Sequence, residues 1–224
     1  MKIGIGITTY NRPECLAKCL EQIQKHTFDI KSYWSVITGL HHVINPKNKE
    51  YEITWYTATD TDKDRRGVAY RKNECLRALQ HCDHIFLFDD DCYPIKDGWV
   101  DFFINSGQEH LLYLNKNDHQ FKFGNEFQQC GGVFMYIRKS AVERVGAFNE
   151  KFGIYGFEHA EYSNRIYGKR NYYLSLPATD QYIYAEDYNA MNFKSSISEI
   201  EKQKWVKANW DKYFNEPLTT YIPL

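Results

Sequence analysis

The sequence predicts a single α/β domain whose first half is built from parallel βαβ units, and two observations support this fold class. In the first hundred residues, short runs of β-branched and aromatic residues alternate with longer runs of helical periodicity. The 224 residues, with 43% hydrophobic and 25% charged side chains, suit one globular domain with a sizeable core. No repeat, low-complexity tract or linker divides the sequence, so we predict one domain over residues 1–224.

The elements expected in the first half follow from local periodicity. Residues 2–9 (KIGIGITT) alternate small and β-branched side chains and predict a first strand. A helix over residues 13–26 follows, because Pro13 suits a first helical turn and apolar side chains then recur at helical spacing. Asp97 is the expected N-cap of a later helix. The other expected strands and helices lie at residues 33–38, 51–57 and 84–88 and at residues 65–81 and 97–106, respectively.

The second half mixes strands and helices less regularly. Gly168 is expected to end the helix that begins near residue 158. The final helix is expected to start at Ser195 or Ser196 and to be anchored by Trp205 and Trp210. The strands are expected at residues 110–115 and 131–139, and the helices at residues 140–146, 158–168 and 195–214.

Charge and cysteine usage narrow the class of protein. Lys and Arg number 28 against 29 Asp and Glu, so the net charge of −1 gives no electrostatic reason to expect nucleic acid or an anionic membrane as the main partner. The six cysteines show neither paired nor zinc-like spacing and are interpreted as free thiols in a reducing compartment. No secretory signal and no transmembrane segment is recognised, so a cytoplasmic location is expected.

Three consecutive aspartates, Asp89, Asp90 and Asp91, follow the apolar strand expected at residues 84–88 (HIFLF). Ligands bind at the carboxyl ends of strands in open α/β sheets. In an extended chain Asp89 and Asp91 share one side, and two carboxylates with open positions suit Mg²⁺ or Mn²⁺ carrying a diphosphate. A solvated acidic turn and a phosphatase-type nucleophile loop are alternatives, although the latter usually follows the first strand.

Four segments resemble those of family-2-type glycosyltransferases of the GT-A fold, and they occur in the family's order. The resemblance extends over roughly residues 3–170. The resemblance implies a GT-A (Rossmann-like) nucleotide-diphospho-sugar transferase fold with a mixed central sheet. Residues 1–115 would form the nucleotide-binding half, and residues 116–224 the acceptor-binding half with the C-terminal helix. The segments are ITTYNRPECLAKCLEQI, RRGVAYRKN, IFLFDDD and the run from CGGVFMYIRK to EHAEYSNRI.

The resemblance also implies which residues bind the nucleotide sugar and the metal. Mn²⁺ or Mg²⁺ would be held by Asp89 and Asp91, with Asp91 as the direct ligand, and would stabilise the leaving diphosphate. A third ligand is left open among Asp180, Glu186 and Asp187. The residues expected to bind the nucleotide sugar are Thr8, Thr9, Tyr10, Asn11, Arg12, Gly67, Arg71, Lys72, Asn73, Asp89, Asp90, Gly131 and Gly132.

Simple chemistry agrees with several of these assignments. A loop between a first strand and a helix offers free backbone N–H groups to an anionic ligand. A cation at Arg71 or Lys72 would face the diphosphate, and Lys72 stands where the family usually has Arg. Gly131 and Gly132 would let the backbone approach the donor sugar closely, although a β-bulge is an alternative reason for them.

Two departures from the family pattern leave specific roles open. The family usually has an acidic residue that reads the base at the end of its second strand, whereas this sequence offers Thr38, His41 and His42 there. Asp60, after the third strand, is either a substitute or part of an ordinary exposed loop.

The second departure concerns the catalytic base. Glu158 matches the family's Glu-Asp pair, but His159 stands at the position of the Asp that takes the acceptor proton in inverting members. A histidine can act as general base near neutral pH. Glu158 and Glu161 are its rivals, and a helix-capping role for Glu158 is the simpler alternative.

The resulting expectation is a metal-dependent glycosyltransferase that moves a sugar, UDP-linked and with inversion, to an acceptor hydroxyl. The acceptor is left open between a glycan, a lipid-linked sugar, a protein, a small molecule and a modified nucleic-acid base. Two other classes stay open as well. A nucleotidyltransferase would use the same acidic strand end but release pyrophosphate, and a non-catalytic nucleotide- or sugar-binding protein would bind without turnover.

Overall fold

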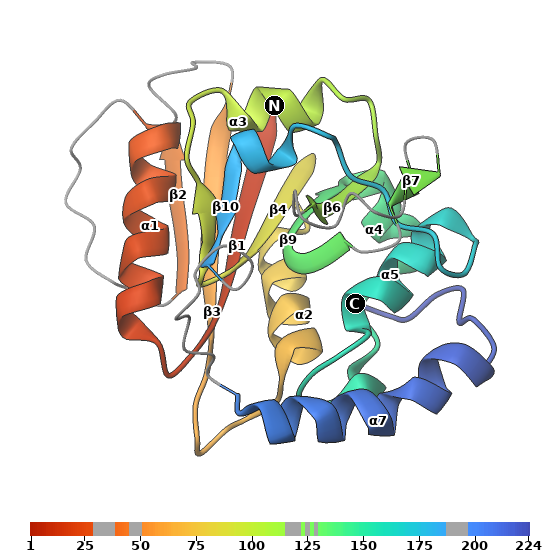
Figure 1. The fold of residues 1–224 in the computed structure, drawn as a ribbon. Coiled ribbons are helices and arrows are strands. Elements are labelled where there is room, and N and C mark those ends of the chain that lie inside the picture. The colour runs from red at the N-terminus through yellow and green to blue at the C-terminus, as the bar shows by residue number, and fades with distance from the viewer. Residues whose placement is uncertain (29–38, 45–50, 115–121, 124–125, 128–129, 187–196) are drawn as a thin grey trace.

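A mixed six-stranded sheet forms the centre of the computed structural model (Figure 1). The strand order is β2-β3-β1-β4-β9-β6. The strands are β1 (Lys2–Tyr10), β2 (Gly39–Ile44), β3 (Glu52–Asp60), β4 (His84–Asp89), β6 (His110–Leu114) and β9 (Cys130–Arg138). The structure describes residues 1–28, 39–44, 51–114, 122–123, 126–127, 130–186 and 197–224.

The helices and smaller elements surround this sheet. Two short sheets pair β5 (Cys92–Pro94) with β10 (Ile183–Ala185), and β7 (Lys122–Phe123) with β8 (Glu126–Phe127). The 3-10 helices are η2 (Glu150–Phe152) and η3 (Thr179–Gln181). The α-helices are α1 (Pro13–Thr27), α2 (Val68–Leu79), α3 (Trp99–Ile104), α4 (Lys139–Val145), α5 (Glu158–Tyr167) and α7 (Glu199–Asn215).

The parallel part of the sheet is narrower than the sequence suggested. β1 runs parallel to both β3 and β4, but β2 pairs with β3 in the antiparallel sense. Only residues 45–51 separate β2 from β3, which is too short for a parallel crossover. The strand expected at residues 33–38 lies outside the described residues. The mixed sheet implied by the family resemblance is confirmed.

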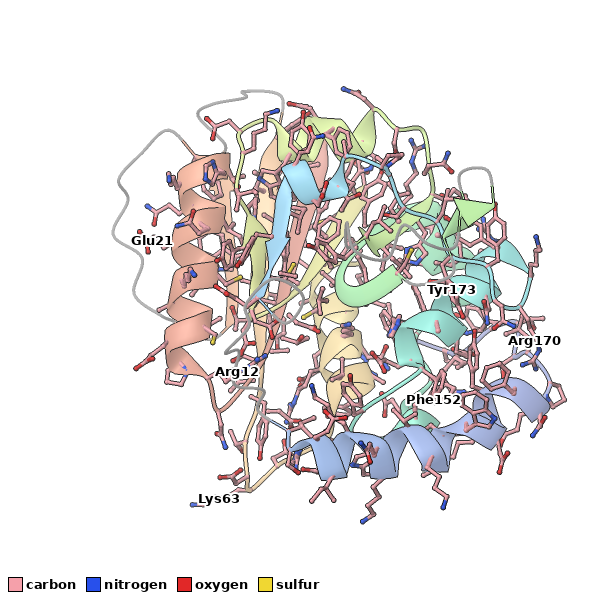
Figure 2. All side chains as sticks on the ribbon, in the orientation of Figure 1. Arg12, Glu21, Lys63, Phe152, Arg170 and Tyr173 are labelled. Carbon is pink, nitrogen blue, oxygen red and sulfur yellow. The ribbon has the colours of Figure 1, made fainter. Side chains whose placement is uncertain are left out.

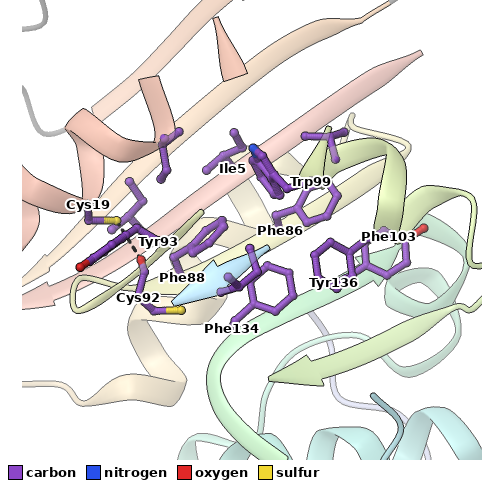
Figure 3. Packing of buried hydrophobic residues seen from close by; sticks show 14 of the residues in the cluster. Ile5, Cys19, Phe86, Phe88, Cys92, Tyr93, Trp99, Phe103, Phe134 and Tyr136 are labelled. Atoms are coloured by element: carbon purple, nitrogen blue, oxygen red, sulfur yellow. Dashed lines mark hydrogen bonds between the residues drawn. The ribbon is translucent and has the colours of Figure 1, made fainter. Parts of the chain in front are cut away.

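The two faces of the sheet carry different helices because side chains alternate along each strand. On β4, Phe86 and Phe88 join the core that packs against α1 and α3, whereas Ile85 and Leu87 join the core under α2, α4 and α5. The first core is rich in aromatic rings (Figure 3). In it, Phe86 contacts Trp99 edge to face, with ring centroids 4.8 Å apart.

Helix termini follow the expectations in part. α5 ends before Gly168, whose φ of +63° suits a left-handed C-cap, as predicted. Gly98 rather than Asp97 precedes α3 as its N-cap, because the Asp97 carboxylate instead contacts Nδ1 of His26 at 2.8 Å. α7 is capped by Ser198, whose hydroxyl accepts a hydrogen bond from the Glu201 N–H. Ser195 and Ser196 lie outside the described residues.

All six cysteines are free thiols, and five of them are buried. Cys19 packs in the aromatic core, where its Sγ lies 3.2 Å from the carbonyl oxygen of Cys92 (Figure 3). Cys19 therefore contributes to packing in this core. Across the described helices, none combines the length and the apolar character that crossing a membrane requires.

His110 at the start of β6 is fully buried. Its burial leads us to expect that the free energy of unfolding of the protein depends on pH. Its Nδ1 lies 2.8 Å from the Tyr136 carbonyl oxygen and its Nε2 lies 2.8 Å from Ser163 Oγ. Burial lowers the pKa of His110 to about 4. Below pH ~6.5 His110 takes up a proton in the unfolded chain but stays neutral in the folded chain. The contribution of His110 to the free energy of unfolding is therefore fully present above pH ~6.5 and is lost as the pH falls toward ~4.

We therefore expect the free energy of unfolding to fall by about 2 kcal/mol more in the wild type than in His110→Gln between pH 7 and pH 5. Urea unfolding at the two pH values measures the difference. Equal losses in the two proteins would show that His110 is not the group that titrates.

Candidate functional site

A cavity of about 370 Å³ opens at the carboxyl ends of β1, β3 and β4. Figure 1 shows α7 running across this end of the sheet. The cavity draws its walls from both halves of the chain. Many of the site residues predicted from the sequence line this cavity. They are Thr8, Thr9, Tyr10, Arg12, Gly67, Arg71, Asp89, Asp91, Gly132, Glu158 and His159.

The three aspartates lie where β4 ends beside β1. Asp89 pairs in register with Thr8, whose hydroxyl donates to the Asp89 carboxylate at 2.8 Å. Asp90 and Asp91 form a turn between β4 and β5. The chain is therefore not extended here, yet Asp89 and Asp91 both line the cavity.

The middle aspartate, Asp90, is fully buried below the cavity. Its carboxylate accepts a hydrogen bond from the Thr9 hydroxyl at 2.6 Å and forms an ion pair with Arg12. Burial raises the pKa of Asp90 to about 7, against the guanidinium and the hydroxyl, which lower it. Asp90 is thus part of the framework that shapes the strand end rather than of the cavity wall.

Lys72 and Asn73 on α2 do not line the cavity. The ammonium of Lys72 is buried, donates to the Gly132 carbonyl at 2.7 Å and lies 3.6 Å from Asp89. The side-chain amide of Asn73 bonds both the N–H and the carbonyl of Phe148. Both side chains tie α2 to the second half of the chain, which accounts for their burial.

Asp60 forms the end of β3 and is buried rather than exposed. Its carboxylate accepts hydrogen bonds from the backbone N–H groups of Arg66 and Gly67, at 2.8 and 2.9 Å. It also accepts from Arg71, which binds Asp64 as well. Asp60 therefore anchors the loop that leads into α2 and forms one wall of the cavity.

Gly67 sits in that loop in close contact with the second half of the chain. Its φ is +92°, and a Cβ at this position would lie 2.3 Å from the Gly153 carbonyl oxygen. Only glycine fits such a conformation and such a contact. Among the predicted residues of the first loop, Asn11 does not line the cavity, and its amide instead donates to Asp62 at 2.8 Å.

Glu158 and His159 begin α5 and form a hydrogen-bonded pair. Nδ1 of His159 lies 3.3 Å from Oε1 of Glu158. Glu158 is 6% exposed, whereas the His159 side chain is 26% exposed and faces the cavity. Burial by itself raises the pKa of Glu158, but the hydrogen bond with His159 and the charges of His159 and Lys72 lower it to about 2.

Glu161, the third candidate base, does not line the cavity. Its Oε1 accepts from Arg165 at 2.8 Å, and Arg165 in turn donates to the carbonyls of Val145 and Ala147. This carboxylate therefore belongs to the network that joins α5 to α4. Of the three candidate bases, His159 and Glu158 line the cavity.

Gly132 on β9 is required by the His159 ring. A Cβ at position 132 would lie 2.5 Å from Cγ and 2.7 Å from Nδ1 of His159. Gly131, its neighbour, pairs with Tyr113 across the sheet at a register shift and does not line the cavity. The register between β6 and β9 therefore shifts beside this pair of glycines.

Replacing Gly132 with alanine should displace the imidazole and lower any His159-dependent turnover by about 10-fold or more, since small misplacements of catalytic groups cost that much. A double-mutant cycle supplies the control. In the His159→Ala background, the Gly132→Ala change should have little further effect. If Gly132→Ala lowers turnover as much in the His159→Ala background as in the wild type, Gly132 has a role that does not depend on the imidazole.

The sequence did not indicate that α7 closes the cavity. Ile197, Lys202 and Val206 line it from that side. Asn209 of α7 is buried and donates to the carbonyls of Phe152 and Tyr155, at 2.6 and 2.9 Å. Residues 202, 206, 209 and 213 recur at helical spacing on one face of α7, and this pattern could have indicated that the helix packs against the rest of the chain.

Glu201 of α7 also contacts Arg65 of the loop before α2 at 2.9 Å. Phe157, with φ of +70°, stacks on Tyr213 of the same helix directly before Glu158. α7 therefore braces both the loop before α2 and the loop that orients the Glu158–His159 pair. Figure 2 shows Arg12 at the cavity end of the sheet and Phe152 beside α7.

The carboxylates of Asp89 and Asp91 fit a divalent metal in donor chemistry, because hard oxygen ligands at a cavity wall suit Mg²⁺ or Mn²⁺. Within the described residues, no three His, Cys, Asp or Glu side chains are grouped closely enough to bind a metal alone. Asp180 and Glu186 do not line the cavity, and Glu186 contacts Lys18 and Tyr93. Asp187 lies outside the described residues.

Comparison with known proteins gives one sequence relative and several structural ones. No family model matches the sequence. The chain is 23% identical over 197 residues to an uncharacterised glycosyltransferase of Acanthamoeba polyphaga mimivirus, covering 76% of this chain and 75% of that protein.

Solved structures with less sequence identity share the fold. S. aureus TarS in complex with UDP matches with a TM-score of 0.52 and 15% identity, over 96% of this chain and 72% of that one. Mannosyltransferase PcManGT from Pyrobaculum calidifontis, in complex with GDP-Man and Mn²⁺, matches with a TM-score of 0.51 and 14% identity over 79% of this chain. This chain spans 55% of the length of that mannosyltransferase. The structural matches show a GT-A-like fold, and the sequence is similar to that of a glycosyltransferase.

Proposed function

We propose that the protein transfers a sugar from a nucleotide diphosphate sugar to an acceptor hydroxyl. The observation that carries this proposal is that two chemical groups line one cavity. Asp89 and Asp91 lie at the strand ends on the proposed donor side, and the Glu158–His159 pair lines the same cavity from the start of α5. The similarity to the mimivirus glycosyltransferase supports the same activity.

We propose a UDP-linked sugar as the donor. The match to TarS extends over 96% of this chain, and TarS has been solved with UDP and with UDP-GlcNAc. Backbone and side chains of Thr8, Thr9 and Tyr10 line the end of the cavity where β1 meets β3 and β4. The nucleotide would bind there, with its diphosphate directed toward Asp91.

A divalent cation, Mn²⁺ or Mg²⁺, would be held by Asp91 together with Asp89, and when bound it would neutralise charge on the departing diphosphate. The mannosyltransferase structure with GDP-Man and Mn²⁺ supports this choice. Asp90 stays buried beneath these two carboxylates and keeps the turn in place through Thr9.

His159 acts as the general base in this proposal. In the tautomer that this role requires, Nδ1–H donates to the Glu158 carboxylate 3.3 Å away and the lone pair of Nε2 takes the acceptor proton. The acceptor oxygen then attacks the anomeric carbon while the carbon–oxygen bond to the diphosphate breaks, and the nucleoside diphosphate leaves with that electron pair. The proton moves from the acceptor to His159. A base on the acceptor serves a single displacement, so the transfer inverts the anomeric centre.

Calorimetric titration with a panel of nucleoside diphosphates, with Mn²⁺ and with chelator, tests the proposal. We expect metal-dependent binding of one diphosphate, and release of that diphosphate from its sugar conjugates when acceptors are screened. Failure of every diphosphate to bind would overturn the proposal. Binding with no turnover in any screen would favour the non-catalytic binding protein, and release of pyrophosphate from nucleoside triphosphates would favour a nucleotidyltransferase.

A further inference from the structure

Arg12 places its guanidinium between two of the three aspartates. Its Nη1 lies 2.7 Å from Oδ2 of Asp91, and its Nη2 contacts Oδ1 of Asp90. The Arg12 side chain is 16% exposed and lines the cavity, while the side chains of its partners are 0% and 6% exposed. A positive charge therefore already occupies one oxygen of the carboxylate that the proposed function assigns to the metal.

The two protein cations at this strand end differ in their surroundings. Lys72 contacts Asp89 from within the core and is fixed by the Gly132 carbonyl. Arg12 instead precedes Pro13 at the first turn of α1 and reaches the carboxylates from the cavity side. A phosphate entering the cavity meets the Arg12 guanidinium but not the Lys72 ammonium.

Charge and geometry suit an exchange of partners at this point. A guanidinium binds phosphate oxygens in the same forked geometry as it binds carboxylates. Moving Arg12 away from Asp91 without replacement would leave a carboxylate with little solvent around it, which is strongly unfavourable. A divalent cation arriving at Asp91 while a diphosphate takes Nη1 of the guanidinium satisfies both of these groups, and Nη2 keeps its contact with Asp90.

We propose that Arg12 is an internal counter-ion that competes with divalent metal for Asp91 until a nucleoside diphosphate draws the guanidinium away. This inference rests on the proposed function, because it presumes that diphosphate and metal share the cavity. Metal binding to the protein alone is then weak, and metal and nucleotide strengthen each other's binding by the same factor. A purely structural ion pair predicts no such gain when Arg12 is removed.

Electron paramagnetic resonance of free Mn²⁺ measures the competition directly, since bound Mn²⁺ loses the sharp signal. Mn²⁺ is titrated into metal-stripped wild type, Arg12→Gln and the control Arg144→Gln, with and without saturating UDP or GDP. Arg144 forms an equivalent two-point ion pair with Glu109 but does not line the cavity. Without nucleotide, we expect Arg12→Gln to bind Mn²⁺ about 10-fold or more tightly than the wild type, and Arg144→Gln to match the wild type.

Loss of Arg12 leaves the buried Asp90 carboxylate without its cation, so Arg12→Gln could unfold. The double variant Arg12→Gln with Asp90→Asn removes that charge and keeps Asp89 and Asp91. Thermal unfolding provides the second readout. Saturating Mn²⁺ alone should raise the melting temperature of the double variant by several degrees more than that of the wild type, because tighter binding to the folded state stabilises it.

The outcomes separate this inference from the proposed function. If neither Arg12 variant binds Mn²⁺ more tightly than the wild type without nucleotide, the counter-ion role is wrong, even where UDP or GDP binds with metal in every protein. If the Arg12 variants gain Mn²⁺ affinity but no diphosphate binds any protein, the competition at Asp91 stands and the proposed function fails.

Discussion

Replacing His159 with alanine should lower the rate of sugar transfer by about 10²- to 10⁴-fold, the range typical of a lost general base. Nucleotide binding should be unchanged, because the ring contacts Glu158, whereas the nucleotide is proposed to bind at Thr8, Thr9 and Tyr10. Steady-state kinetics with the donor and acceptor identified by the binding screen, together with calorimetry on the same variant, separates the two effects.

A matched control for this variant is His26→Ala. His26 also pairs with a carboxylate, that of Asp97, but outside the cavity. It should retain full transfer activity. Glu158→Gln should lower kcat with little change in the donor KM, because the amide no longer holds the imidazole as a carboxylate does. Full activity in His159→Ala would transfer the role of base to another group.

Asp91→Asn should weaken metal-dependent binding of the nucleoside diphosphate by about 100-fold or more. Loss of an outer-shell partner already costs about 10- to 100-fold in metal affinity, and Asp91 is proposed as a direct ligand. Calorimetric titration of the diphosphate with Mn²⁺ and with chelator measures the difference. The residual affinity of the variant should equal that of the wild type in chelator.

Asp83→Asn is the control for this prediction, since Asp83 precedes β4 at the opposite end of the strand, where its carboxylate bonds the Lys2 N–H. Its binding should match that of the wild type. Unchanged metal-dependent binding in Asp91→Asn would remove the aspartate triplet from the donor site.

The sequence predicted those parts of the fold that local patterns determine. Alternating side chains marked β1, an apolar run marked β4, and helical spacing after Pro13 marked α1, because each signal lies within a few neighbouring residues. The antiparallel pairing of β2 was not predicted, since strand direction depends on the length of a connection and on which edge of the sheet is free. Ser198 escaped notice because several serines near the start of α7 offered equivalent caps.

The candidate site shows the same division. Short motifs led to Asp89, Asp91, Glu158 and His159, which the structure brings to one cavity. Asp60 and Asn209 were not assigned their roles because each acts through hydrogen bonds to backbone groups of another loop, and no local spacing reveals those partners. Lys72 was expected to face the diphosphate, whereas long-range packing buries it.

That burial has a consequence for how this protein can evolve. One ammonium, Lys72, lies 3.6 Å from Asp89 and also helps to lower the pKa of Glu158. A substitution at any of these three positions changes the electrostatic setting of the other two, so their effects should not add. Across related sequences, positions 72, 89 and 158 are expected to covary, and a lineage that loses this lysine should show compensating changes at both carboxylate positions.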